Sequence, residues 1–429
     1  MTYRQTLDYI FSKLPMFSRV GAEAIKNGFA NIYALCESLG QPQAKCRYVH
    51  IAGTNGKGSV SHMIASVLQT AGYKTGLYTS PHLKDLRERI KINGNEITEQ
   101  EVTDFIGRLQ PDIEKIKPSF FEITVAMAFD HFSKHNCDIA VIETGLGGRL
   151  DSTNIVTPEI AVITNIGYDH VHILGASLSE IAVEKAGIIK PGIPVIIGET
   201  HAETENVFDD FSRKNNSEIH FADQELHVTN WYYDGEALVT EVAGQNKIDH
   251  KKYQVDLTGH YQTKNILTAL SACHALQTKG WAINESHLKT GLQHAKKNTG
   301  LHGRWETINH NPRIILDVAH NPDGMQQVLN QLEITTYHTL HFVLGMVKDK
   351  DVNTVLSMLP KTAKYYFANA HVPRALAAKE LKESAARYNL KGNIYDNVND
   401  AIEEAKAHSH EDDLILVCGS VFLVGEVIY

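Results

Sequence analysis

The chain has 429 residues, too many for one hydrophobic core, which suggests about two or three domains. Its 43% hydrophobic and 21% charged residues are typical of a folded protein. Its 41 basic and 50 acidic side chains give a net charge of −9, which argues against a nucleic-acid-binding protein. The 5 cysteines include no Cys-x-x-Cys pair, which indicates core positions in a reducing compartment. With no signal peptide and no membrane-length apolar run, we expect a cytoplasmic protein.

A glycine loop at residues 53–59 follows the first expected strand. Residues 1–46 carry apolar side chains at helical spacing, 48–52 suit a buried strand, and the apolar positions after the loop repeat helically until Gly72. Such a loop lets the backbone approach a phosphate, while Lys57 supplies a cation and Ser59 a hydroxyl for magnesium. The strict Walker spacing needs glycine where the chain has Ile51, so the loop is a shortened variant. We expect a nucleoside triphosphate here; the alternative is an ordinary glycine turn with a solvated lysine.

Later strands deliver polar residues at their ends. Strands expected at 74–79, 139–142 and 160–163 run into Ser80, Glu143 and, a few residues on, His170, and another is expected at 195–197. The carboxyl ends of parallel strands meet at one edge of a sheet, so these residues should lie near the glycine loop. Singly each is weak, because Glu143 is as easily structural and His170 is one of 23 histidines. Together they suit magnesium, which prefers oxygen ligands.

Three other stretches of residues 1–298 are less regular: a charged run, a pair of aromatic residues and a segment with strand-like alternation. The charged run 85–91 is expected to be a solvated segment. Phe120 and Phe121 precede a helix expected at 122–132, itself preceded by one at 99–109, and are either core packing or a wall for an aromatic ligand. From 219 to 257 the pattern changes to short alternating runs, and Asp234 with Gly235 predicts a hairpin within a small antiparallel β section.

A fresh alternation of strands and helices begins after the polar stretch 296–300. Strands are expected at 313–316, 340–344, 365–368 and 414–417, with helices between them. The predicted fold class is therefore α/β. A P-loop-type ATPase domain over residues 1–298 has a mostly parallel sheet and the small antiparallel β section, and a smaller C-terminal Rossmann-like α/β domain covers 299–429.

The motifs, taken together, resemble a known family. They are residues 52–59, 79–83, 143–154, 169–170, 184–187, 316–322 and 418–420. In this order, over nearly the whole chain, they resemble the folylpolyglutamate synthase and dihydrofolate synthase group of the Mur ligase superfamily. The resemblance implies an ATP-dependent carboxylate–amine ligase. Such an enzyme joins L-glutamate to dihydropteroate, making dihydrofolate, and extends reduced folates to polyglutamates through an acyl phosphate.

The resemblance also assigns the ATP and magnesium sites. The ATP residues it implies are Asn55, Gly56, Lys57, Gly58, Ser59, Asn265, Arg304 and Asp317. The residues implied for Mg²⁺ are Ser80, Glu143, His170 and Lys185. Lys185 matches the family lysine that becomes carbamylated, which turns a cation into a carboxylate-like ligand; a plain salt bridge to Glu184 is the alternative.

Substrate residues follow from the same resemblance. The pterin or folate site is expected from Ser119, Phe120, Phe121, Leu150, Asp151 and Ser152. Glutamate is expected at His320 and Ser420, and the catalytic residues are Lys57, Lys185, Asp317 and His320. Since Asp317 and His320 belong to the second domain, catalysis should require domain closure about residues 298–302. Asp317 and His320 also have a plainer interpretation, as polar neighbours of a helix cap at Asn321.

The resemblance leaves open which reaction the chain catalyses. The sequence Arg149-Leu150-Asp151 favours a bifunctional enzyme over a folylpolyglutamate synthase alone, while residues 14–28 match no pattern that can be carried over. A Mur-type peptide ligase should have a further N-terminal domain, and a non-catalytic nucleotide-binding protein should lack Lys185, Glu143 or Asp317. The expected partners are small molecules (ATP, dihydropteroate or a reduced folate, and L-glutamate), with no nucleic acid or membrane, and the family suggests a monomer.

Overall fold

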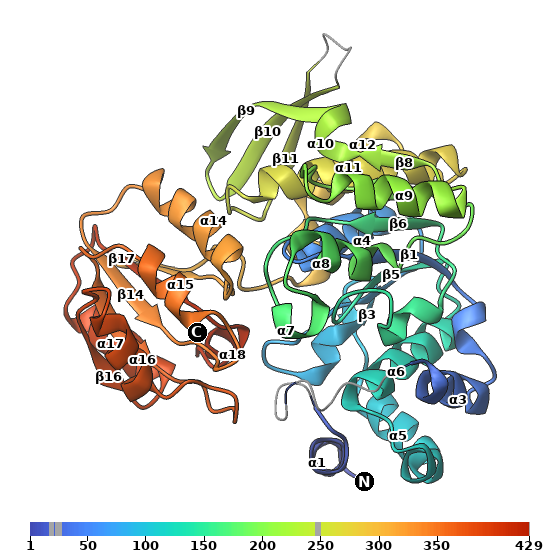
Figure 1. The fold of residues 1–429 in the computed structure, drawn as a ribbon, viewed down its shortest axis with the longest axis horizontal. Coiled ribbons are helices and arrows are strands. Elements are labelled where there is room, and N and C mark those ends of the chain that lie inside the picture. The colour runs from blue at the N-terminus through green and yellow to red at the C-terminus, as the bar shows by residue number, and fades with distance from the viewer. Residues whose placement is uncertain (17–20, 22–27, 245–249, 429) are drawn as a thin grey trace. The chain divides into compact units, whose positions relative to one another are not determined.

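The computed structural model describes residues 1–16, 21, 28–244 and 250–428 (Figure 1). Most of the unassigned stretch 14–28 lies outside the described residues. The chain divides into two compact units. The first comprises residues 1–167, 171–256 and 262–301, and the second 168–170, 257–261 and 302–429.

The first unit is built on an eight-stranded sheet of order β4-β3-β2-β5-β1-β6-β7-β8. Its strands are β1 (Arg47–Ala52), β2 (Thr75–Tyr78), β3 (Ile90–Ile92), β4 (Asn95–Glu96), β5 (Ile139–Glu143), β6 (Ile160–Ile163), β7 (Val195–Ile197) and β8 (Ile219–Phe221). All neighbours from β2 to β8 pair in parallel, while β3 and β4 are antiparallel. The predicted mostly parallel sheet is confirmed. Because β1 lies between β5 and β6, the loop that follows it adjoins the polar residues that follow both neighbours.

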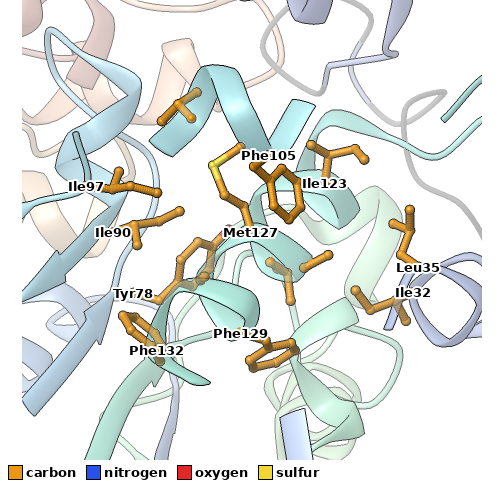
Figure 2. Close-up of a cluster of buried hydrophobic side chains, with 14 of the residues drawn as sticks. Ile32, Leu35, Tyr78, Ile90, Ile97, Phe105, Ile123, Met127, Phe129 and Phe132 are labelled. Carbon is orange, nitrogen blue, oxygen red and sulfur yellow. The ribbon is translucent and has the colours of Figure 1, made fainter. Parts of the chain in front are cut away.

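The helices of this unit largely match the apolar periodicity. They are α1 (Tyr3–Lys13), α3 (Ala30–Ser38), α4 (Lys57–Thr70), α5 (Glu99–Ile116), α6 (Phe120–Lys134), α7 (Val171–Leu174), α8 (Leu178–Ala186), α9 (Glu205–Asn215), α10 (Ala222–Glu225), α11 (Gln262–Thr278), α12 (Glu285–Gln293) and α13 (Ala295–Thr299). α6 begins two residues before its predicted start, because Ser119 and Glu122 form a capping box. Its side chains fill a core shared with α5, where Phe105, Met127 and Phe132 are each at most 3% exposed (Figure 2).

A three-stranded antiparallel sheet forms the predicted small β section. It consists of β9 (Leu226–Asp234), β10 (Ala237–Gly244) and β11 (Lys251–Val255). The predicted hairpin is confirmed: Asp234 pairs with Ala237, and Gly235 takes the left-handed φ of 60° that favours glycine. The prediction that this section starts at 219 was wrong, since β8 extends the large sheet in parallel.

The expectation of a solvated segment at 85–91 was also wrong. The run forms a short 3₁₀ helix (Leu86–Arg89) and then enters β3, which pairs with β2. Arg89 and Lys91 are only 7% and 4% exposed. Strand pairing carries both cations inward, where they find acceptors that the local pattern does not reveal.

The second unit contains a six-stranded sheet of order β12-β13-β17-β14-β15-β16. The strands are β12 (Glu306–His310), β13 (Arg313–Leu316), β14 (Leu340–Leu344), β15 (Lys364–Ala368), β16 (Gly392–Tyr395) and β17 (Leu414–Cys418). The helices are α14 (Pro322–Glu333), α15 (Val352–Met358), α16 (Ala378–Ala386), α17 (Val398–Ala407) and α18 (Val421–Gly425). All strand pairs except β12–β13 are parallel, which confirms a second α/β sheet. Among the described residues, no helix is long and apolar enough to cross a membrane.

Candidate active site

The glycine loop after β1 is braced by residues that follow β6. Gly53 has a φ of 150°, and a Cβ there would lie 1.9 Å from Oγ1 of Thr164, so only glycine fits. The Thr164 hydroxyl donates to the carbonyl of Asn55 (2.6 Å), and the Asn55 amide donates to Oδ1 of Asn165 (2.9 Å). The loop is thus held in one shape before any ligand arrives, as a phosphate-binding loop requires.

The start of α4 is joined to α11 by a chain of side-chain amides. Gly56 is the N-cap at a left-handed φ of 81°, and a Cβ there would lie 2.4 Å from Oδ1 of Asn265. Asn265 donates to Gln262 (2.7 Å), and Gln262 donates to the hydroxyl of Ser59 (3.1 Å). Two predicted ATP residues, Ser59 and Asn265, therefore meet through Gln262. Sequence reasoning gave Gln262 no role, although it lies three residues before Asn265 on one helix.

Two ammonium groups bind the carbonyls of the loop. Lys57 donates to the carbonyls of Gly53 (3.1 Å) and Thr54 (3.3 Å). Lys185, on α8 and only 3% exposed, donates to the carbonyl of Gly53 (2.8 Å). Glu184, offered as a salt-bridge partner of Lys185, pairs with Arg149 at 2.7 Å. The predicted catalytic lysines thus share an acceptor, and positive charge gathers where phosphates are expected.

Glu143 and Ser80 are neighbours, as predicted for a shared magnesium ion. The backbone amide of Ser80 donates to Oε2 of Glu143 (3.2 Å), and Glu143 is 4% exposed. A further cation was missed: Arg89 donates to Nδ1 of His82 (2.8 Å) and lies 5.1 Å from the ring centre of Phe120. Burial lowers the pKa of Arg89, against the opposing charges of Tyr78 and Glu143.

The predicted pterin residues at the start of α6 have structural partners. The amide and hydroxyl of Ser119 donate to Oε2 of Glu122 at 2.6 and 2.9 Å. Phe120 is 4% exposed and packs against Phe11, with ring centres 6.0 Å apart, so it belongs to the core. Phe121 is only partly buried; a Cβ on Gly145 would lie 2.5 Å from its ring. Of the two aromatics, Phe121 is therefore the better candidate for a ligand wall.

Asp151 organises the loop after β5. Its carboxylate accepts hydrogen bonds from the amides of Gly145, Leu146 and Thr153 and from the Thr153 hydroxyl, at 2.9, 2.9, 3.0 and 2.5 Å. A carboxylate offers about four lone-pair positions, so a pterin would have to replace one of these donors. Burial raises the pKa of Asp151, and the hydrogen bonds oppose that rise. Leu150 is 42% exposed and Ser152 is partly buried.

In the second unit, Asp317 follows β13 and is 3% exposed. It accepts the hydroxyl of Tyr261 (2.7 Å) and the amides of Trp305 (2.9 Å) and Ala319 (2.9 Å). Burial raises its pKa, and these hydrogen bonds and the charge of Arg304 oppose the rise.

Two further predicted residues of this unit make local contacts. The guanidinium of Arg304 donates to the carbonyl of Gly303 (3.2 Å). Ser420 caps α18 by accepting the amide of Phe422 (3.1 Å). Arg304 and Ser420 thus each have a structural role, and their roles in ligand binding stay predictions.

Asp169 is the centre of a cationic cluster in the second unit. It lies 2.5 Å from Nζ of Lys350 and 3.4 Å from Nε2 of His320. Burial favours its neutral form, but the hydrogen bond and charge of His320 and the charges of Lys350 and His170 hold its pKa well below the ordinary range. Lys350 also lies 3.0 Å from Nε2 of His170, and burial with the charge of Lys350 lowers the pKa of His170 to about 3. A metal at that nitrogen would therefore have to replace Lys350, a residue that no sequence motif indicated.

The structure thus groups the predicted site residues by unit. Ser59, Ser80, Glu143 and Lys185 belong to the first unit. His170, Arg304, Asp317, His320 and Ser420 belong to the second. Joint roles for residues of the two units remain predictions.

Comparison with known proteins places this geometry in a family. The Mur ligase middle domain matches residues 51–273 and the Mur ligase glutamate ligase domain matches residues 303–421. A dihydrofolate synthase/folylpolyglutamate synthase from Bacillus subtilis is 34% identical over 94% of both chains.

Solved structures agree. One described as E. coli FolC in complex with DHPP and ADP has a TM-score of 0.85 at 28% identity and covers 99% of this chain and 96% of its own. A Mycobacterium tuberculosis folylpolyglutamate synthase complexed with ADP and AMPPCP has a TM-score of 0.83 at 31% identity, covering 93% and 94%. The chain therefore belongs to the dihydrofolate synthase/folylpolyglutamate synthase family of Mur ligases.

Proposed function

We propose that this chain is an ATP-dependent ligase that joins L-glutamate to dihydropteroate and extends reduced folates by further glutamates. The observation that carries the proposal is the meeting of Lys57 and Lys185 on the Gly53 carbonyl of a preformed glycine loop. The Bacillus subtilis relative bears both activities in its name, and the E. coli structure holds DHPP and ADP.

The reaction requires the site to position the substrates and to stabilise negative charge. A carboxylate is a poor electrophile, so its oxygen first attacks the γ-phosphorus of ATP, which releases ADP and gives an acyl phosphate. The glutamate amine then attacks the acyl carbon, the C–O bond to phosphate breaks, and the amide forms as the amine loses a proton. Both steps bring anions together, which calls for positioning and positive charge. Lys57 and the amino end of α4 supply positive charge beside the loop.

Magnesium fits the residues present. Ser80 and Glu143 offer oxygen atoms, and the Glu143 carboxylate is buried with the Ser80 amide against it. When bound, the ion neutralises phosphate charge. A carbamate on Lys185 would add a further oxygen ligand at the loop. We also propose that the enzyme acts as a monomer, which light scattering on the purified chain tests.

Phosphate release tests the proposal. ATP hydrolysis should be stimulated by dihydropteroate together with L-glutamate, and separately by a reduced folate together with L-glutamate. Stimulation by the reduced folate alone would restrict the chain to folylpolyglutamate synthesis, the name that the Mycobacterium tuberculosis protein bears. Stimulation by neither would favour a non-catalytic nucleotide-binding protein.

A further inference from the structure

Two histidines and a glutamate meet at the end of α6 that is farther from the candidate site. His131 lies in the last turn of α6, and His135, four residues further on, is the C-cap residue of the same helix. Glu101, in the first turn of α5, faces both: its Oε1 lies 3.4 Å from Nδ1 of His131 and 2.7 Å from Nε2 of His135. One ligand atom from each residue lies within 4.8 Å of the others. We propose that Glu101, His131 and His135 bind one divalent transition-metal ion of the zinc class.

The donor set selects the metal. Two imidazole nitrogens and one carboxylate oxygen suit zinc, cobalt, nickel or copper, whereas magnesium and calcium prefer oxygen ligands alone. Tetrahedral ligands at about 2.0 Å from zinc lie about 3.3 Å from one another. The His131–Glu101 distance of 3.4 Å matches this value, and the His135–Glu101 distance of 2.7 Å needs to open by a few tenths of an ångström. A rotation of the half-exposed His135 side chain, which is 43% exposed, provides that change.

Two of the ligands are held in position. The other oxygen of Glu101, Oε2, accepts the amide (2.9 Å) and hydroxyl (2.6 Å) of Thr98, so Oε1 remains directed at the histidines. Partners of this kind orient metal ligands and strengthen their binding. His131 is 7% exposed, and its neighbour Phe132 anchors α6 in the core shown in Figure 2.

His131 is almost fully buried, and its Nδ1 faces Oε1 of Glu101. Without metal, the same groups form an ordinary hydrogen-bonded pair between α5 and α6, and this is the competing interpretation. The partial exposure of Glu101 (34%) and His135 (43%) leaves a fourth coordination position open to water.

The cluster is separate from the predicted pterin residues at the start of α6 and independent of the proposed ligase activity. Ser119, at the other end of α6, precedes His131 by 12 residues, which corresponds to about 18 Å along a helix. A metal here would join the first turn of α5 to the last turn of α6, and so stabilise the core between them.

Cobalt titration of the chelator-treated full chain, in excess Mg²⁺, tests the proposal. We expect one equivalent of Co²⁺ with visible d–d absorption, displaced by Zn²⁺, and a melting temperature that rises with Zn²⁺. His131→Gln, His135→Gln and Glu101→Gln should each weaken binding at least about tenfold, because loss of even an outer partner costs about 10- to 100-fold.

Two controls locate the ion. His371 pairs with Glu426 at 2.7 Å, so His371→Gln breaks an isolated His–Glu pair and should leave cobalt binding unchanged. Glu143→Gln should also leave it unchanged. The proposal is overturned by an absence of cobalt binding, by full binding in folded His131→Gln and His135→Gln variants, or by loss of binding in Glu143→Gln. Melting curves of the metal-free variants establish that they are folded.

Discussion

Substitution of Gly56 by alanine tests whether the loop and its neighbour on α11 act together. Two glycines with left-handed φ flank α4: Gly56 (81°) and Gly72 (91°). Forcing alanine into this conformation costs about 1–2 kcal/mol of unfolding free energy at either position. At Gly72 a Cβ meets nothing within 4 Å, whereas at Gly56 it would lie 2.4 Å from Oδ1 of Asn265. Asn265 must then move and lose its hydrogen bond to Gln262, worth about 1 kcal/mol more.

Gly72→Ala is therefore the matched control for Gly56→Ala. Urea denaturation should give a loss of about 1–2 kcal/mol for Gly72→Ala and about 2–3 kcal/mol for Gly56→Ala. Calorimetric titration with a non-hydrolysable ATP analogue should show normal affinity in Gly72→Ala. In Gly56→Ala the affinity should fall about tenfold or more, since displacing Asn265 disturbs the loop at a cost of about 1.4 kcal/mol or more. Equal stability losses with unchanged affinity in both variants would refute the coupling of Gly56 to Asn265.

Three other predictions concern named side chains. Lys185→Ala should be nearly inactive in phosphate release and partly restored by bicarbonate or a short carboxylic acid; a fully active variant would remove the carbamate from the mechanism. Burial, aided by the charge of Lys190, lowers the pKa of His50 to about 3. Below pH 6.5 the imidazole of His50 therefore binds a proton in the unfolded chain but stays neutral in the folded chain. The contribution of His50 to the free energy of unfolding is therefore complete above pH 6.5 and falls by about 2–3 kcal/mol by pH 4.5. Urea denaturation at the two pH values should show this loss in the unmodified chain and not in His50→Gln. Lys350→Met should raise the pKa of His170 from about 3, because a neighbouring positive charge is removed; an unchanged NMR titration of His170 would contradict the ion cluster.

Several of the strands that the sequence predicted contain a run of apolar residues. β6 and β7 are apolar and buried at every position, and parallel sheets covered on both faces produce such runs. β16 was missed because its two central residues are exposed, which breaks the apolar pattern. β12 was missed because a register shift interrupts its pairing with β13, so its alternation is broken. Edge strands are set by the neighbour they pair with, which local sequence does not contain.

The candidate site also contains residues that the sequence predicted and residues that it did not. Residues within continuous motifs, such as Lys57, Glu143 and Lys185, could be proposed from the sequence because the motif order itself carries information. The residues that brace them were not: Gln262 reaches Ser59 across 203 positions. Lys350 reaches Asp169 across 181 positions. Such partners are chosen by tertiary packing, and a single sequence gives no sign of the pairing.

Charge shows most clearly why local patterns fail. Lys91 belongs to a run that resembles a solvated segment, yet its ammonium donates to the carbonyls of Thr299 (2.9 Å) and Gly300 (3.3 Å). His62 lies 2.7 Å from the hydroxyl of the same threonine, and burial lowers the pKa of Lys91. A buried cation is tolerated only when it is paired with acceptors. The hydrogen bonds therefore stabilise both the buried ammonium of Lys91 and the backbone at residues 299 and 300. The first unit thereby fixes its own chain up to Gly300. The hinge at residues 298–302 stays a prediction, and these contacts would restrict its bending to the residues after Gly300.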